Sequence, residues 1–338
     1  MERKSNFELF RIVCILLIVL MHTFGSGNGQ FNTQLGIFIN VIGNIGVTGF
    51  VLLSGYFGIH LKAKKLVKMD LMLIFWSVLS FLLLSFHPDM QLEFGFRDII
   101  SSVMPIISHK YWFLSAYFCL CILSPFINEY VESISKERMK QLILVSGILF
   151  LIIPTLFGFD QTGDGGKGIV NMILAYVVGR YIGIYHKGAK ISVGKLMGVF
   201  VGTVIVNFLL NDASYLVSGN VSNYYARDNS ILTMVQAVSL FLIFMQMNFS
   251  KKWINILATN VVAVYVLEDT IKILLHTMYP FSYIHSQANY YVLVVFCVMV
   301  IVYVVGCLLE ALRKLIFGKA EDFIIDKIGN KVLKWKKQ

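Results

Sequence analysis

The chain has 338 residues, of which 57% are hydrophobic and 14% are charged, and its formal net charge is +10. Soluble domains carry about 25% charged residues, so this composition excludes a water-soluble protein folded around one core. The lysines and arginines are scattered through short segments, which gives no support for binding to nucleic acid. The sequence therefore predicts a polytopic protein embedded in a lipid bilayer.

Apolar runs recur along the whole chain, and each is close to the ~20 residues that a helix needs to cross a bilayer. We therefore predict an all-α, polytopic transmembrane helical bundle of about ten spans, which forms an integral-membrane domain over residues 1–318. The predicted spans cover residues 7–24, 35–57, 69–86, 111–130, 141–159, 168–186, 195–211, 230–248, 253–276 and 289–312.

The distribution of positive charge predicts the orientation of these spans. When the N-terminus is placed in the cytoplasm, most of the 29 lysines and arginines fall in cytoplasmic segments, as the positive-inside rule requires. Both termini are then cytoplasmic, and we predict a multi-pass protein of the cell membrane. Residues 319–338 are typical of a basic amphipathic tail helix, which would lie on the anionic inner leaflet.

Arg11 and His22 both lie inside the first predicted span. Ionisable residues inside a span are costly and are usually kept for function. Eleven residues make about three helical turns, so the two side chains share one helix face, roughly 16 Å apart. This geometry predicts a ligand that lies along the helix, with its anionic part at Arg11 and its reactive end at His22. The alternative is a snorkelling arginine and a histidine that hydrogen-bonds to a neighbouring helix.

Small residues in the second span are followed by a cluster of lysines. Gly46, Gly49 and Gly55 predict close helix packing, or alternatively a smooth face along which a ligand chain passes. The lysines lie at the predicted cytoplasmic end of the span: Lys62, Lys64, Lys65 and Lys68. Ammonium groups are good partners for phosphates, so the cluster predicts a phosphate-binding site. The alternative is that these lysines serve only to orient the span.

Tyr111 and Trp112 open the fourth span at its predicted outer end. They would form part of an interfacial aromatic belt, or line a pocket for an acceptor at the depth of His22. The five cysteines all fall inside predicted spans, and no Cys or His spacing typical of metal ligands occurs. We therefore expect no metal site and no tightly bound cofactor.

Glu268 and Asp269 are adjacent carboxylates inside the ninth predicted span, at a depth similar to that of His22. A carboxylate near an imidazole fixes its tautomer and stabilises its protonated form. Glu268 would therefore assist His22, with Asp269 beside it as a candidate acceptor-binding residue. The alternative is a structural ion pair between Glu268 and Lys272, one helical turn apart.

Four stretches, in this order, resemble the acyltransferase 3 family of bacterial integral-membrane acyltransferases. They are the Arg-x10-His pattern from Arg11 to His22, residues 46–56 with the basic segment after them, residues 111–128 and residues 264–269. The resemblance implies transfer of an acyl group, commonly acetyl, from cytoplasmic acyl-coenzyme A to a hydroxyl of a surface polysaccharide or its lipid-linked precursor. It also implies that His22 is the residue associated with transfer and Arg11 its partner.

Two departures from the family pattern matter. The basic segment is all lysine here, where many relatives use arginine, so bidentate contacts with phosphate are lost. Glu268 stands where relatives often have histidine, which leaves open whether Glu268 or Asp269 assists His22.

The residues agree with this resemblance. Coenzyme A is an anionic nucleotide on a long, thin arm, so Arg11 and the lysines would hold its phosphates while the arm runs along the first span. His22 would act as a general base on the acceptor hydroxyl, or would form a transient acyl-histidine. The rival class is a transporter or flippase for a saccharide or small solute, which buried charges also fit. The absence of an internal repeat argues against it.

Overall fold

The computed structural model describes residues 4–25, 33–87, 95–221, 223–278 and 290–335, and these residues form helices with no strand among them. The predicted all-α fold is confirmed. The elements are α1 (Ser5–Gly25), α2 (Thr33–Gly43), α3 (Ile45–Phe57), α4 (Ala63–Ser85), α5 (Phe96–Val103), α6 (Trp112–Ser133), α7 (Lys136–Gly147), the π-helical turn η1 (Ile148–Ile152), α8 (Ile153–Phe157), α9 (Ile169–Tyr185), α10 (Val193–Ser218), the 3-10 turn η2 (Tyr224–Ala226), α11 (Ile231–Gln246), α12 (Lys252–Ala258), α13 (Val261–Met278) and α14 (Tyr291–Trp335).

Among the described residues, seven helical runs are long and apolar enough to cross a membrane, and α12 with α13 makes an eighth if this pair, bent by 57°, is one span. The seven are Ser5–Phe24, Gln34–Phe57, Ala63–Ser85, Trp112–Ser133, Lys136–Phe157, Val193–Ser218 and Tyr291–Lys327. The predicted multi-span architecture is confirmed to this extent. α9 and α11 coincide with two further predicted spans but are shorter, at 17 and 16 residues, so the count of ten stays a prediction.

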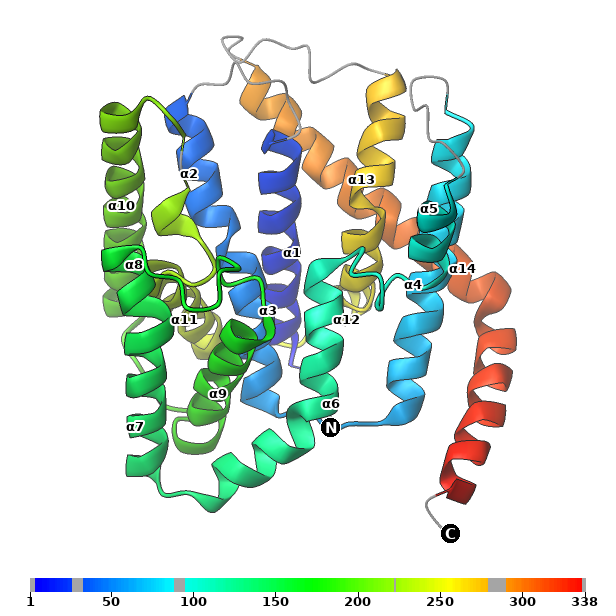
Figure 1. Ribbon diagram of the computed structural model, residues 1–338, viewed down its shortest axis with the longest axis horizontal. Helices are drawn as coiled ribbons and strands as arrows, with labels where there is room; N and C mark the ends of the chain where they lie inside the picture. The colour runs from blue at the N-terminus through cyan, green and yellow to red at the C-terminus, as the bar shows by residue number, and fades with distance from the viewer. Residues whose placement is uncertain (1–3, 26–32, 88–94, 222, 279–289, 336–338) are drawn as a thin grey trace.

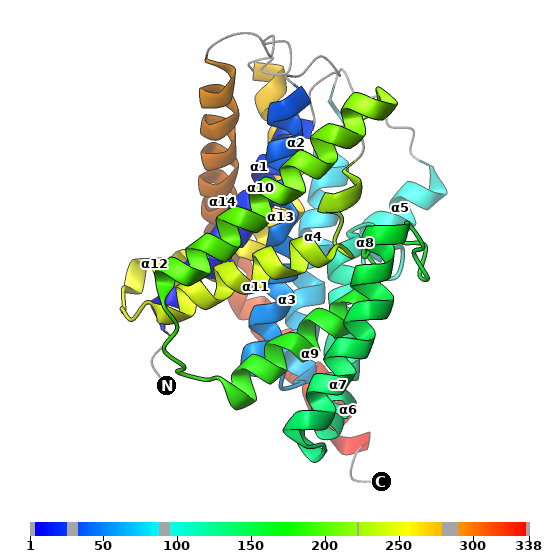
Figure 2. The ribbon, with the colours of Figure 1, turned by 90° about the vertical axis from the view of Figure 1, so that its left-hand side faces the viewer.

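α1 stands in the middle of the bundle (Figure 1), where it packs against α2, α3, α11, α12, α13 and α14. α10 and α11 pack against each other and run obliquely across one side (Figure 2). α1 begins and α14 ends toward the same end of the molecule, where α4 also begins (Figure 1). The central position of α1 lets helices far apart in the sequence meet the residues that it carries.

Glycines bring α3 into close contact with α9 and α1. A Cβ atom on Gly55 would lie 2.2 Å from the carbonyl oxygen of Tyr176 on α9. One on Gly46 would lie 2.5 Å from the carbonyl oxygen of Cys14 on α1. Real side chains do not fit at such distances, so these glycines allow the close helix contacts that small residues provide in membranes. Close packing therefore explains Gly46 and Gly55.

A buried charge network joins α14 to α4 and to the break between α12 and α13. Arg313 donates to Glu310 at 2.8 Å, and the indole of Trp76 on α4 donates to the same carboxylate at 2.7 Å. Lys314 donates to Asn260 at the break, at 2.7 Å. Because the buried Glu310 and Arg313 meet partners in place of water, the cost of burying their charges is offset. The network joins α14 to the break before α13, the helix that carries Glu268.

Candidate functional site

His22 and Glu268 are in direct contact. His22 lies in the last turn of α1, and its Nδ1 is 2.5 Å from Oε1 of Glu268 on α13. The Glu268 side chain is 3% exposed, whereas that of His22 is 35% exposed. An ionised carboxylate can only accept hydrogen bonds, so the proton of the neutral imidazole lies on Nδ1, and Nε2 is the basic nitrogen. Glu268 thus holds the tautomer that a general base needs.

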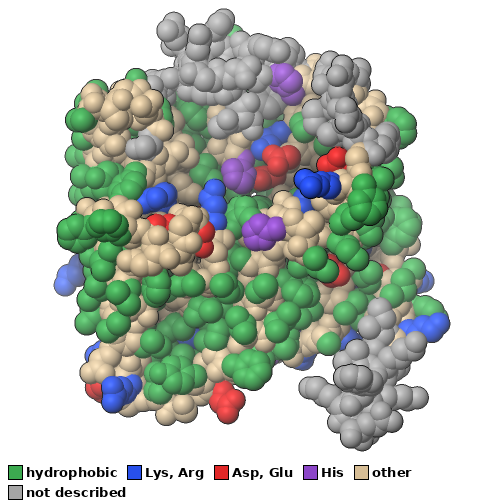
Figure 3. Space-filling model, viewed as in Figure 1, with side chains coloured by type: hydrophobic (Ala, Val, Ile, Leu, Met, Phe, Trp, Pro, Cys, Tyr) green, Lys and Arg blue, Asp and Glu red, His purple; other side chains and the backbone are tan. Residues whose placement is uncertain are grey.

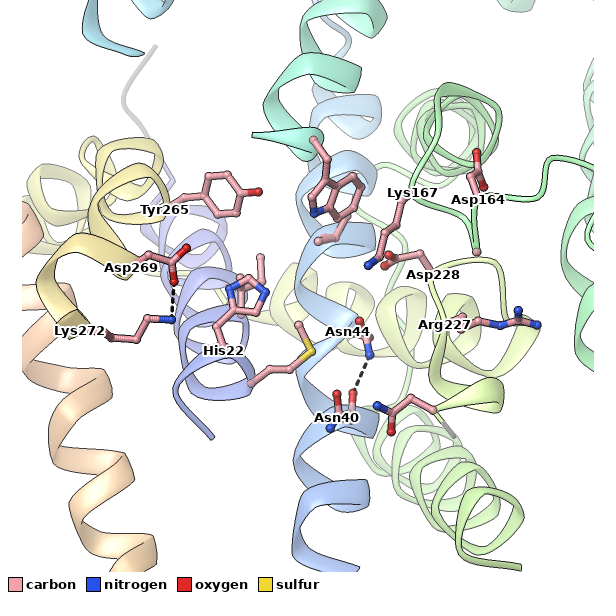
Figure 4. A pocket seen from close by; sticks show the side chains of 16 residues that line it. His22, Asn40, Asn44, Asp164, Lys167, Arg227, Asp228, Tyr265, Asp269 and Lys272 are labelled. Carbon is pink, nitrogen blue, oxygen red and sulfur yellow. Dashed lines mark hydrogen bonds and ion pairs between the residues drawn. The ribbon is translucent and has the colours of Figure 1, made fainter. Parts of the chain in front are cut away.

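Asp269, and not Glu268, is the ion-pair partner of Lys272. Lys272 Nζ lies 2.8 Å from Asp269 Oδ1, so the alternative of an ion pair between Glu268 and Lys272 is wrong. The reason is direction, because successive side chains on a helix point about 100° apart. Glu268 faces α1, whereas Asp269 and Lys272 lie together at the edge of a cavity (Figure 4).

Two adjoining cavities meet at His22. The histidine cavity has a volume of about 670 Å³, and the side cavity beside it has a volume of about 480 Å³. His22, Trp112, Tyr265 and Asp269 line both, and Tyr111 lines the side cavity. The three residues predicted to bind an acceptor, Tyr111, Trp112 and Asp269, therefore all lie around His22. In Figure 3, basic, acidic and histidine side chains gather around a hollow in the face shown, above a broad hydrophobic surface.

Two further cavities continue from the histidine cavity along α1. The arginine cavity, of about 350 Å³, shares Ile18 and Tyr265 with the histidine cavity. The lysine cavity, of about 340 Å³, shares Arg11, Ser54, Met69 and Tyr117 with the arginine cavity. The lysine cavity therefore adjoins the arginine cavity, which adjoins the histidine cavity and, through it, the side cavity. The series runs from the start of α4 to the contact between His22 and Glu268.

Arg11 lies at the opposite end of this series from His22. It forms an ion pair with Glu8 at 2.8 Å and lines both the arginine and the lysine cavities. Ile15 and Ile18 line the arginine cavity between Arg11 and His22, so these four positions form the single helix face that the sequence predicts. Arg11 does not line the cavities at His22, and this position favours contact with a different part of the ligand.

The structure divides the four lysines into two pairs. Lys62 and Lys65 line the lysine cavity. Lys64 and Lys68 point instead to α14, where they form ion pairs with Asp326 at 2.6 Å and Asp322 at 2.9 Å. Of the five residues predicted to hold phosphates, Arg11, Lys62 and Lys65 line the lysine cavity, whereas Lys64 and Lys68 do not. The two aspartates belong to the segment predicted as a separate tail, which continues α14 without a break at Gly318.

A hydrogen-bond network holds the loop that carries Lys62. The backbone N–H of Ile59 donates to the Tyr176 hydroxyl at 2.8 Å, and Asn128 Nδ2 donates to the Ile59 carbonyl at 3.0 Å. The Tyr176 hydroxyl in turn donates to Asn128 Oδ1 at 2.7 Å. Gly58 has a φ of +73°, which ends α3 and turns the chain toward the cavity mouth. The mouth of the lysine cavity is thus fixed from α6 and α9.

Sequence reasoning missed the wall of the histidine cavity that faces His22. This wall, called the loop wall from here on, contains Asp164 and Lys167 from the loop before α9, and Arg227 and Asp228 from the segment before α11. Two signals were present. Lys167 and Arg227 are cations in predicted outer loops that are otherwise poor in them, and residues 160–168 combine aspartates with repeated glycines.

The fold and this site define a helical membrane protein with a histidine–carboxylate pair at the end of a series of cavities. A family model described as an acyltransferase domain, that of the acyltransferase 3 family, matches residues 4–311. The chain belongs to this family, which confirms the resemblance found in the sequence, and the protein is an integral-membrane acyltransferase. Comparisons with curated proteins and with solved structures find no match.

Proposed function

We propose that the protein transfers an acyl group, with acetyl as the expected one, from cytoplasmic acyl-coenzyme A to a hydroxyl of a cell-surface polysaccharide or lipid-linked saccharide. The observation that carries this proposal is the series of adjoining cavities along α1. It begins among cations at Lys62, Lys65 and Arg11 and ends at His22. A donor with an anionic head, a long thin arm and a reactive end matches this order of chemistry.

The donor would enter through the lysine cavity. Lys62, Lys65 and Arg11 would contact its phosphates, because charge-assisted hydrogen bonds to phosphate are among the strongest that side chains make. The arginine cavity that follows is lined mainly by apolar side chains, such as those of Ile15 and Ile18. It would hold the long thin arm of the donor. The thioester would then reach the histidine cavity, where Nε2 of His22 is the base.

In the proposed step, the acceptor hydroxyl oxygen attacks the thioester carbonyl carbon while His22 Nε2 takes the hydroxyl proton. Glu268, which accepts the hydrogen bond from Nδ1, stabilises the imidazolium that forms. Collapse of the tetrahedral intermediate breaks the carbon–sulfur bond and releases the coenzyme A thiolate, which takes the proton back from the imidazolium. A transient acyl-histidine would use the same nitrogen as nucleophile.

The test uses membranes that contain the protein, radiolabelled acetyl-coenzyme A and surface glycans from the host cell. We expect label to enter glycan with wild-type protein and to fall by at least 10²-fold, the scale of general-base catalysis, with His22→Ala. His186→Ala is the matched control, because His186 follows α9 and lines none of the four cavities. Saccharide movement across the membrane without any consumption of thioester would instead support the transporter or flippase and would refute the proposal.

A further inference from the structure

The loop wall is built by two segments that are held together. Asn171 on α9 donates from Nδ2 to the carbonyl of Gly166, at 3.2 Å, and to the carbonyl of Asp228, at 3.0 Å. Gly166 has a φ of +87°, and a Cβ atom there would lie 2.3 Å from the backbone nitrogen of Asn229. Only glycine allows the two segments to pack this closely. The wall is therefore positioned without help from a ligand, which lowers the cost of binding one.

Asp228 is a carboxylate of this wall with an unsatisfied buried oxygen. It is 3% exposed, and its Oδ1 has no hydrogen-bond partner among the described residues. The other carboxylates of the histidine cavity differ, since Asp164 accepts from the N–H of Gly166 at 2.8 Å and Asp269 pairs with Lys272. A buried acceptor without a partner is costly. A ligand that donates O–H groups to Asp228 would remove this cost.

The surroundings of Asp228 disfavour its charged form. Burial raises the pKa of Asp228 to about 7, while the charge of Lys167 acts to lower it and that of Asp164 to raise it. Lys167 also lies over the ring of Trp112, with its Nζ 5.8 Å from the ring centroid. Lys167 and Asp228 lie on the same side of the cavity, opposite His22 (Figure 4).

When Asp228 is ionised, the charges around the histidine cavity balance. Among the described residues, the carboxylates that line it are Asp164, Asp228 and Asp269, and the cations are Lys167, Arg227 and Lys272. A cavity with equal numbers of both signs does not concentrate anions. Trp112 adds a flat aromatic surface, and Asn40 and Asn44 add amide groups. An aromatic surface with a few convergent polar groups suits an uncharged ring that carries several hydroxyls.

We infer that the loop wall binds the acceptor, and that the acceptor group is an uncharged sugar ring whose hydroxyls donate hydrogen bonds to Asp228. A neighbouring hydroxyl of the same ring is then turned toward His22 on the opposite wall. This inference rests on the proposed function and specifies the class of its acceptor. Asp228 binds and orients the ring, and His22 remains the residue that moves the proton.

The test measures binding and acetylation of 4-nitrophenyl glycosides by the purified full-length protein. The uncharged probes are the glucoside, the galactoside and the N-acetylglucosaminide, and the charged probes are the matching glucuronide and galacturonide. Binding is followed by saturation-transfer NMR, and transfer by label from acetyl-coenzyme A. We expect wild-type protein to prefer at least one uncharged probe over its charged match by about tenfold or more, the scale of one hydrogen bond to a charged group.

Asp228→Ala should raise the KM for the preferred glycoside by about tenfold while leaving the Kd for acetyl-coenzyme A unchanged. Asp228→Asn leaves the cavity with an excess cation, so it should shift the preference toward the glucuronide. A purely structural role for Asp228 would not produce that shift. Asp212→Asn is the control, because Asp212 on α10 lies outside the cavity and accepts a hydrogen bond from Gln34 Nε2 at 3.4 Å.

Three results overturn the inference: an unchanged KM and preference in both Asp228 variants, a wild-type preference for the charged probes, or failure of wild-type protein to bind any uncharged probe. Binding that depends on Asp228 but leads to no acetylation would support the loop wall and refute the proposed transfer. The two proposals can therefore fail separately.

Discussion

The two ends of the cavity series differ in the charged side chains that line them. At the lysine end, Arg11, Lys62 and Lys65 line the cavities, and no carboxylate lines them among the described residues. At the histidine end, carboxylates and cations are equal in number. A net positive cavity attracts an anionic ligand, whereas a balanced one gives no such attraction. The comparison teaches that adjoining cavities of one molecule can differ in net charge, as the proposed anionic donor and uncharged acceptor require.

The histidine end should be the more sensitive to substitution, and Glu268→Gln should have the largest effect there. The glutamine amide can donate to Nδ1, which places the imidazole proton on Nε2 and removes the base. We expect kcat to fall by about 10³-fold, with little change in the KM for acyl-coenzyme A. Steady-state kinetics against both substrates measure this split. Asp269→Asn should lose far less, and equal losses in the two variants would contradict the role given to Glu268.

Blocking the passage between the two ends should have the next largest effect. Ser54 lines both the lysine and the arginine cavities, and its hydroxyl lies 3.0 Å from that of Tyr117. Ser54→Leu would place a bulky side chain where the two cavities adjoin, so we expect kcat/KM for acyl-coenzyme A to fall by about 100-fold, because small misplacements of a reacting group are costly. Ser54→Ala keeps the space open and should stay near wild type. Full activity of the leucine variant would show that the donor does not pass here.

Substitutions at the lysine end should change the KM for acyl-coenzyme A and leave kcat almost unchanged. Lys62→Ala with Lys65→Ala removes two cations from the cavity, and we expect the KM for acyl-coenzyme A to rise by about tenfold, less so at high salt. Lys64→Ala with Lys68→Ala is the matched pair, since those lysines contact Asp326 and Asp322 on α14. It should raise the KM less than twofold, as expected for loss of exposed ion pairs. Equal effects of the two pairs would mean that only overall charge matters.

Much of what α1 and α13 contribute to the site follows from the sequence. The face shared by Arg11 and His22 depends only on helical geometry within one segment, and that geometry holds in the structure. The similar depth of Glu268 and His22 also comes from counting residues along two helices. The contact between them does not, because it depends on how α13 packs against α1. Among the lysines, spacing alone cannot separate those that face the cavity from those that face α14.

The loop wall was hidden from sequence reasoning because two segments far apart in the sequence build it. Asp228 and Asp164 are 64 positions apart in the sequence, and they meet only because Asn171 and Gly166 hold their segments together. Periodicity finds helix faces but gives no signal for contacts between loops. The cations in predicted outer loops and the aspartates and glycines of residues 160–168 were the visible clues, and orientation rules alone do not convert them into a site.

The smallest predicted effect concerns the free energy of unfolding that the protein loses by burying the Asp228 carboxylate without a partner. Burial raises the pKa of Asp228 to about 7 in the folded protein, from an ordinary value of 3.8. Between these values the unfolded chain releases a proton that the folded chain keeps, so the free energy of unfolding falls as pH rises and levels off above about pH 7. The Asp228→Asn variant has no carboxyl group at this position, so its free energy of unfolding does not fall in this way. The difference in Tm, variant minus wild type, should therefore increase by about 5 °C between about pH 4 and about pH 8. Thermal unfolding in detergent measures the difference. Asp212→Asn should show an offset that does not depend on pH, and the same flat offset for Asp228→Asn would mean that the carboxylate is already satisfied.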